Sequence, residues 1–183
     1  SINNPSKYIN SNLVGFGNIL EQCKTYEVEH LLYASSSSIY GGNTKIPFSE
    51  NDFVDYPISL YAATKKANEL MAHAYSNLFK IPSTGFRLFT VYGPWGRPDM
   101  APMIFTKAIL AEEPIKIFNN GDMFRDFTFI DDVSDAIIKL IEIPPKYLND
   151  KHNVREGDSN ISTPYRVLNI GNNTSINIMD FIE

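Results

Sequence analysis

The chain has 183 residues, of which 43% are hydrophobic and 20% are charged, and this composition predicts a packed globular protein rather than a disordered one. The net charge of −5 gives no basic footprint for nucleic acid, and no apolar run approaches the roughly 20 residues that cross a bilayer. Neither nucleic acid nor a membrane is therefore an expected partner. The single cysteine, Cys23, and a start without a recognisable secretory signal favour the cytoplasm.

The first half of the chain alternates between helical and strand patterns. Apolar residues recur at helical spacing in two long segments, and short apolar runs near turn-forming residues predict buried strands. The predicted elements are a helix over 6–25, a strand over 29–35, a surface loop over 39–59, a helix over 60–79 and a strand over 84–89. Small residues on the two helices favour their packing side by side.

The second half continues the alternation with shorter elements. The predicted elements are a loop over 90–102, a helix over 103–112, strands over 115–118 and 125–130, a helix capped by Asp131 or Asp132 and running to about 143, a polar and mobile excursion over 146–164, a strand over 166–170 and a helix beginning near Ile176. This alternation favours an α/β fold with a parallel sheet. No glycine-rich strand–turn–helix of the dinucleotide-binding type occurs in the chain.

A tyrosine and a lysine stand four residues apart at the start of the predicted helix over 60–79. This spacing places Tyr61 and Lys65 on one face of the helix. A free tyrosine, with a pKa of about 10, is a poor base at neutral pH, but a nearby ammonium favours the phenolate form. With a hydroxyl such as Ser36 from the preceding strand end, the pair can exchange a proton with a sugar hydroxyl. Many solvated helices carry such a pair by chance, so the surrounding sequence has to decide.

The surrounding sequence resembles a known family. The segments similar to the extended short-chain dehydrogenase/reductase family are Ala34–Gly41 (ASSSSIYG), Pro47–Glu50 (PFSE) and Ser59–Met71 (SLYAATKKANELM). Within this family, Arg87–Ala101 (RLFTVYGPWGRPDMA) and Arg125–Asp132 (RDFTFIDD) resemble UDP-glucuronate 4-epimerases. These motifs occur in the family's order and cover nearly the whole chain.

The resemblance implies an NAD-dependent nucleotide-sugar epimerase that converts UDP-glucuronate to UDP-galacturonate through a 4-keto sugar. The implied fold is α/β, a partial Rossmann-like doubly wound parallel sheet with a smaller α/β substrate-binding portion. Residues 1–90 would form the C-terminal half of the NAD-binding domain with the catalytic residues, and residues 91–183 the substrate-binding portion. A UDP-sugar substrate and a homodimer formed through the two long helices are also implied.

The family motifs further imply roles for individual residues. The catalytic residues would be Ser36, Tyr61 and Lys65. The cofactor-binding residues would be Asn12, Ser35, Tyr61 and Lys65. The substrate-binding residues would be Ser36, Ser37, Ser38, Thr90, Arg97 and Arg125. A planar guanidinium suits phosphate oxygens. The alternatives are that Ser37 and Ser38 only cap backbone groups, and that the two arginines form surface ion pairs with Asp99 or Asp126. The histidines show no metal-ligand spacing, so no metal site is expected.

Two other functions remain open. A dehydratase or decarboxylase of the same superfamily would carry acidic residues where this chain has Ser37 and Ser38. A truncated chain that binds nucleotide sugar without catalysis is the second alternative. Because the family's glycine-rich loop and ribose-selecting residue are not found here, we expect a fragment that lacks the first half of the cofactor domain. Such a fragment would bind NAD weakly and be inactive alone.

Overall fold

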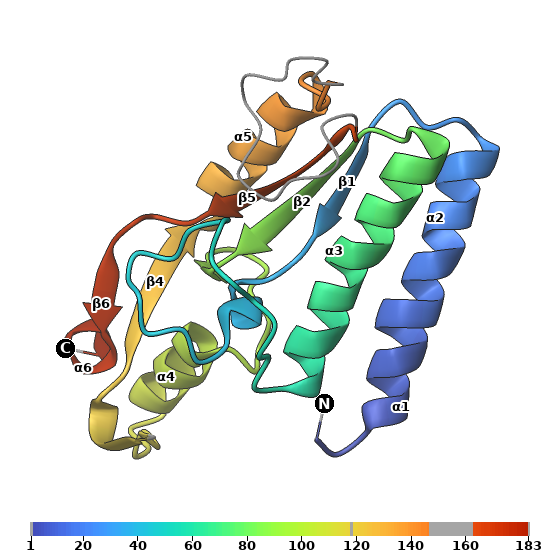
Figure 1. The fold of residues 1–183 in the computed structure, drawn as a ribbon. Coiled ribbons are helices and arrows are strands. Elements are labelled where there is room, and N and C mark those ends of the chain that lie inside the picture. Colours follow the sequence, from blue (N-terminus) through green and yellow to red (C-terminus); the bar gives the residue numbers. More distant parts are fainter. Residues whose placement is uncertain (1, 118, 147–162, 183) are drawn as a thin grey trace. The chain divides into compact units, whose positions relative to one another are not determined.

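The computed structural model describes residues 2–117, 119–146 and 163–182, and the chain divides into two compact units (Figure 1). The first unit comprises Ser1–Leu88 and Ile138–Asn169, and the second comprises Phe89–Ile137 and Ile170–Glu183. No helix within the described residues has the length and hydropathy that a membrane span requires. The roles assigned above to residues 1–90 and 91–183 stay a prediction, because compactness does not show what a unit binds.

Two long helical segments belong to the first unit, and both are confirmed where the apolar spacing predicts them. The elements are the helix α1 (Pro5–Tyr8), the π-helix η1 (Ile9–Val14), the helix α2 (Gly15–Thr25) and the helix α3 (Leu60–Phe79). The first three are consecutive and replace the single predicted helix over 6–25. The start of α3 is fixed by Ser59, whose side-chain oxygen accepts a hydrogen bond from the backbone N–H of Ala62 at 3.1 Å.

The two helical segments run side by side, as Figure 1 shows for α2 and α3. A Cβ at Gly17 would lie 3.4 Å from the Met71 methyl carbon, so a small residue there allows close approach. The π-helix adds polar contacts to α3. The Asn12 side-chain amide donates to the Thr64 hydroxyl at 3.0 Å, and its backbone carbonyl accepts from the Asn68 amide at 2.6 Å. These bonds fix the rotation of α3 about its axis relative to η1.

A three-stranded sheet lies beside these helices in the first unit. Its strands are β1 (Leu31–Ala34), β2 (Ser83–Leu88) and β5 (Tyr165–Ile170), in the order β1-β2-β5. Strands β1 and β2 are parallel, and α3 lies between them in the chain, which is the crossover that parallel pairing needs. The hydrophobic core is formed by Leu20, Cys23, Leu31, Tyr33, Ala72 and Ile81. The α/β fold predicted from the alternation is thus confirmed.

A glycine in β2 makes room for an aromatic pair in this sheet. A Cβ at Gly85 would lie 2.6 Å from the Tyr33 hydroxyl oxygen, which is closer than real Cβ contacts allow. The Tyr33 hydroxyl can therefore reach the Tyr165 hydroxyl at 2.8 Å, which joins β1 to β5 across β2. Burial raises the pKa of both phenols, so neither carries charge near neutral pH.

The second unit contains its own small sheet. Its elements are the strands β3 (Thr90–Tyr92), β4 (Phe124–Phe129) and β6 (Ser175–Asn177), the helices α4 (Ala101–Leu110) and α6 (Ile178–Ile182), the 3₁₀ turn η3 (Asn119–Gly121) and most of the helix α5 (Ile130–Ile141). The sheet order is β3-β4-β6, with β3 and β4 parallel and β6 antiparallel to β4. The Phe127 ring of β4 stacks on Phe181 of α6 with ring centroids 4.2 Å apart.

The predictions for the second half are less accurate than those for the first. The strand predicted over 115–118 is wrong for residues 115–117, and residue 118 lies outside the described residues. Strand β3 lies within the predicted loop over 90–102, and β6 was not predicted. Helix α5 already begins at Ile130, so both aspartates lie in its first turn instead of at the cap. Most of the predicted excursion over 146–164 lies outside the described residues.

Candidate active site

The tyrosine and lysine of the predicted acid/base pair lie in the first two turns of α3. Tyr61 and Lys65 share one face of the helix, and the Lys65 ammonium lies 6.0 Å from the centroid of the Tyr61 ring. The same ammonium donates a hydrogen bond to the backbone carbonyl of Ala34, the last residue of β1, at 2.9 Å. The helix start and the strand end are therefore joined directly, two residues before Ser36.

The electrostatic surroundings of Lys65 are unusual for a lysine. Its side chain is half-buried, and among the described residues no carboxylate oxygen lies within ion-pair distance of it. Burial lowers the pKa of Lys65, because desolvation disfavours the charged ammonium. The nearest hydrogen-bond partner is a neutral carbonyl, so the positive charge is not neutralised by a neighbouring acid.

The serines that follow β1 are held in a tight arrangement. Ser36 is the N-cap of the 3₁₀ turn η2 (Ser37–Tyr40), and its hydroxyl oxygen accepts from the Ser38 backbone N–H at 3.2 Å. The Ser36 hydroxyl also donates to the Ser38 hydroxyl oxygen at 3.0 Å, which leaves the Ser38 proton for another acceptor. Within the described residues, the Ser37 hydroxyl has no hydrogen-bond partner. The capping alternative thus fits Ser36 and not the side chains of Ser37 and Ser38.

The side chains of two predicted cofactor-binding residues form hydrogen bonds to other residues of this chain. The Ser35 side chain is buried, and its hydroxyl donates to a carboxylate oxygen of Glu69 at 2.6 Å. Asn12 is half-buried, and its amide is bonded to Thr64 of α3. Both side chains therefore hold neighbouring elements together. Their contact with a cofactor stays a prediction.

The remaining predicted substrate-binding residues belong to the second unit. Thr90 begins β3 and is half-buried. Arg97 is exposed and forms an ion pair with Asp99 at 2.6 Å, which is the surface pairing considered as the alternative to phosphate binding. Arg125 is exposed and does not pair with Asp126, whose carboxylate instead accepts from the Asn172 backbone N–H at 2.9 Å. The substrate roles of these three residues stay a prediction.

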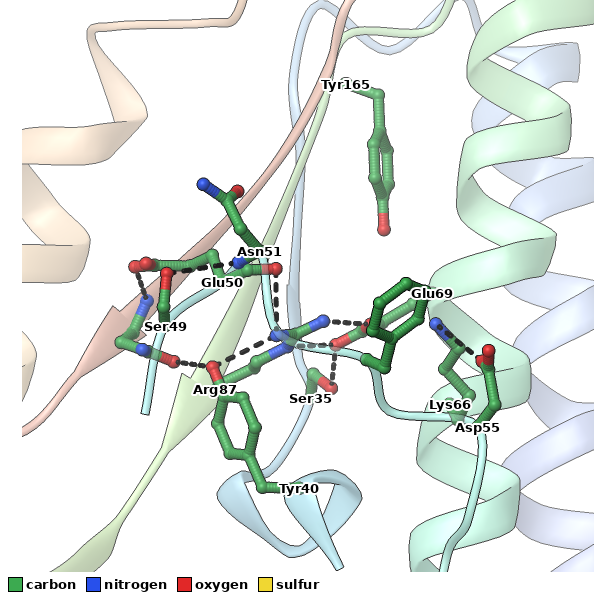
Figure 2. Close-up of polar contacts among 12 residues, drawn as sticks. Ser35, Tyr40, Ser49, Glu50, Asn51, Asp55, Lys66, Glu69, Arg87 and Tyr165 are labelled. Atoms are coloured by element: carbon green, nitrogen blue, oxygen red, sulfur yellow. Dashed lines mark hydrogen bonds and ion pairs between the residues drawn. The ribbon is translucent and has the colours of Figure 1, made fainter. Parts of the chain in front are cut away.

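The structure also contains a buried polar cluster that the sequence did not reveal (Figure 2). Glu69 of α3 and Arg87 of β2 form an ion pair, and each side chain is 4% exposed. The Arg87 guanidinium also donates to the Tyr40 hydroxyl at 3.0 Å and, at 3.4 Å, to the backbone carbonyl of Glu50. The available sequence signal is only that Glu69 stands four residues after Lys65 and so shares its helix face.

The loop after η2 is anchored to the same cluster. The Tyr40 hydroxyl donates to the Asn169 side-chain oxygen at 2.6 Å, and the Tyr40 ring stacks on Phe48 at 4.5 Å between centroids. The Asn169 backbone N–H donates to the Glu50 carboxylate at 2.7 Å. The surface loop predicted over 39–59 is thus found after residue 40, with most of its residues exposed, and Glu50 binds it to the end of β5.

The fold and these motifs place the chain in a family. A profile described as the NAD dependent epimerase/dehydratase family matches residues 1–154, and the chain belongs to this family. The family membership predicted from the sequence motifs is therefore confirmed. Two similar proteins are Protein CapI of Staphylococcus aureus, at 52% identity over all of this chain and 55% of the relative, and a probable UDP-glucuronate 4-epimerase of Rhizobium meliloti (strain 1021), at 50% identity over all of this chain and 54% of the relative.

A solved structure agrees with these relatives. The UDP-glucuronic acid 4-epimerase of Bacillus cereus, determined in complex with UDP-glucuronic acid and NAD, matches with a TM-score of 0.79 and 32% identity. This match covers 96% of the present chain and 50% of the Bacillus cereus chain. The chain thus spans about half the length of the relatives it matches.

Proposed function

We propose that this protein catalyses the C4 epimerisation of UDP-glucuronate to UDP-galacturonate with NAD as its cofactor. The observation that carries the proposal is the position of Tyr61 and Lys65 on one face of α3, with the Lys65 ammonium bonded to the carbonyl at the end of β1. The identity of 50% to a probable UDP-glucuronate 4-epimerase supports the choice of substrate.

The donors beside β1 suit the ribose of a nicotinamide nucleotide. A lysine ammonium has three N–H donors, and Lys65 uses one of them on the Ala34 carbonyl. The two remaining donors suit the two free hydroxyl groups of such a ribose. When bound there, NAD supplies the hydride acceptor for C4 of the sugar.

Tyr61 is the proposed acid/base residue. The Tyr61 phenolate would take the proton of the C4 hydroxyl as the C4 hydride leaves. It would return this proton when the hydride is delivered to the other face of the 4-keto sugar, so the reaction has no net oxidation. The Lys65 charge favours the phenolate that accepts this proton. Ser36 contributes a hydroxyl to the same hydrogen-bond network, held in place by its bonds to Ser38.

The substrate contacts in this proposal come from the serines after β1 and from the second unit. Ser37 and Ser38 donate their hydroxyls to the sugar carboxylate, which adds no negative charge near it. Arg97 and Arg125 bind the diphosphate, and Thr90 adds a hydroxyl on the substrate side. Binding by Arg97 requires it to exchange its exposed partner Asp99 for phosphate. An exposed ion pair is worth about 1 kcal/mol or less, so this exchange is inexpensive.

An assay with the natural full-length protein and NAD tests the function. We expect UDP-glucuronate to be converted to UDP-galacturonate, followed by chromatography of the nucleotide sugars, and UDP-glucose to be converted more slowly. Equal rates on the two sugars would remove the reason for naming glucuronate. If neither sugar is converted, the proposed epimerase activity is wrong.

We also propose that the protein is a homodimer formed through α2 and α3. Both helices expose large apolar side chains, among them Ile19, Leu70 and Leu78, each more than half exposed. Apolar side chains gathered on a helix pair favour association with a second copy. Sedimentation equilibrium at micromolar concentration should give the mass of two chains, and Leu70→Glu with Leu78→Glu should give one. A parent protein that sediments as a monomer would contradict the dimer.

A further inference from the structure

Glu69 and Arg87 form a buried pair whose position is more informative than its strength. The Arg87 guanidinium binds both carboxylate oxygens, through Nε to Oε1 at 3.0 Å and through Nη2 to Oε2 at 2.9 Å (Figure 2). Taking two charges out of water costs free energy that the pair only partly recovers, so a buried pair is weak evidence for stability. Its place in the fold suggests a different role.

The pair lies beside the strand end that carries the candidate catalytic serine. The Ser35 hydroxyl donates to the Glu69 carboxylate at 2.6 Å, and Ser35 directly precedes Ser36. One residue earlier, the Ala34 carbonyl accepts from Lys65 at 2.9 Å. Two successive residues at the end of β1 are therefore held by two side chains of α3 that are one helical turn apart. These bonds set the register between Ser36 and the acid/base pair on α3.

Glu69 is also the natural ion-pair partner of Lys65. Residues four apart on a helix are neighbours, and a lysine and a glutamate in these positions commonly pair. Here both oxygens of Glu69 are engaged by Arg87, and Ser35 shares one of them. Within the described parts of the chain, no carboxylate oxygen is at ion-pair distance from Lys65. Arg87 is itself held on its other side by the Tyr40 hydroxyl at 3.0 Å.

We propose that Glu69 and Arg87 are positioning residues for the acid/base centre: Arg87 holds the Glu69 carboxylate on Ser35 and away from Lys65, so that the Lys65 ammonium acts on Tyr61. The role of Tyr61 in this proposal rests on the proposed function. The separation of the two charges rests on the contacts of Glu69 alone.

Several other titratable groups lie around these residues. Tyr8 of α1 faces the Tyr61 ring edge-on, with centroids 6.2 Å apart. Tyr33 of β1 and Tyr165 of β5 interact electrostatically with Glu69 and Arg87, and burial raises the pKa of both phenols. Tyr40 of η2 binds Arg87, and burial raises its pKa as well. Charged groups also surround this cluster: Glu50 acts electrostatically on Tyr40, Asp52 interacts with Arg87, and Lys66, next to Lys65, pairs with Asp55 at 4.0 Å.

A proton titration of Tyr61 tests the proposal without requiring turnover. The natural full-length protein is labelled with ¹³C at the tyrosine ring, and the Tyr61 signal is assigned by its loss in Tyr61→Phe. In Arg87→Met, Glu69 is free to pair with Lys65, and we expect the Tyr61 signal to change at a higher pH than in the parent protein. Adding Glu69→Gln to Arg87→Met removes the competing carboxylate and should return the titration close to that of the parent.

Two further variants make the result decisive. Arg87→Lys keeps the positive charge but can bind only one carboxylate oxygen of Glu69. We therefore expect the Tyr61 titration to move in the same direction by a smaller amount. This variant tests the proposal if Arg87→Met does not fold. Asp55→Asn with Lys66→Met removes the ion pair of 4.0 Å next to Lys65 and should leave the titration unchanged. An unchanged titration in the Arg87 variants, or no return with Glu69→Gln, would overturn the proposal. A parent protein without epimerase activity would reject the proposed function separately.

Discussion

Replacing Tyr61 with phenylalanine should lower the turnover of UDP-glucuronate by about 100- to 10,000-fold, which is the usual contribution of a positioned acid/base group. The substitution removes the hydroxyl proposed to exchange the C4 proton and keeps the ring that packs edge-on against Tyr8. Lys65 keeps its hydrogen bond to the Ala34 carbonyl, because that bond does not involve the phenol. The measurements are turnover under saturating UDP-glucuronate and calorimetric titration with UDP, whose affinity should be nearly unchanged.

Tyr8→Phe is the matched control for this experiment. It removes a phenol from the neighbouring ring without touching the Lys65 pair, so turnover should stay close to that of the parent. Near-normal turnover of Tyr61→Phe would show that another residue is the base. A large loss of turnover in Tyr8→Phe would indicate that the roles of Tyr8 and Tyr61 have been assigned wrongly.

Replacing both Ser37 and Ser38 with alanine should reduce the preference for UDP-glucuronate over UDP-glucose by a factor of several tens or more. Each hydrogen bond to a charged group is worth about 1.5–3 kcal/mol, and UDP-glucose has no carboxylate that would lose it. The structure leaves both hydroxyl protons available, since Ser38 accepts from Ser36 and Ser37 has no partner among the described residues. The measurement is the ratio of kcat/KM for the two sugars.

The control for the serine substitutions is Ser134→Ala, which removes an exposed hydroxyl from α5 and should leave the ratio unchanged. The double variant should also retain its turnover of UDP-glucose, because Ser36 remains and keeps its hydrogen bond with the backbone of residue 38. A ratio that does not fall in the double variant would mean that the carboxylate is bound elsewhere.

The strongly periodic elements and the juxtaposition of Tyr61 and Lys65 could be read from the sequence. Helix α3 begins and ends as predicted, because Ser59 is a good N-cap and the apolar spacing runs without interruption. The position of Tyr61 relative to Lys65 follows from helix geometry alone, since residues four apart lie on one face. These are local properties, and they hold wherever the helix packs.

The short strands could not be read in the same way. Strands β3 and β6 have three residues each, which is too few for a pattern, and their pairing with β4 defines them. The run over 115–117 alternates apolar and polar residues as a strand does, yet it is not a strand in the structure. A strand needs a partner for its backbone groups, and the sequence of one segment does not say whether that partner is present.

The sequence by itself determined the family motifs, the two long helices, the parallel α/β pattern and the face that Tyr61 shares with Lys65. Only the tertiary structure decided that Glu69 turns to Arg87 and Ser35 instead of Lys65, because helix spacing allows either partner. It also decided that Tyr40 meets Asn169, which is 129 residues away in the chain. Local periodicity fixes which residues share a face, whereas the partner that a buried charge finds depends on which distant segments the fold brings beside it.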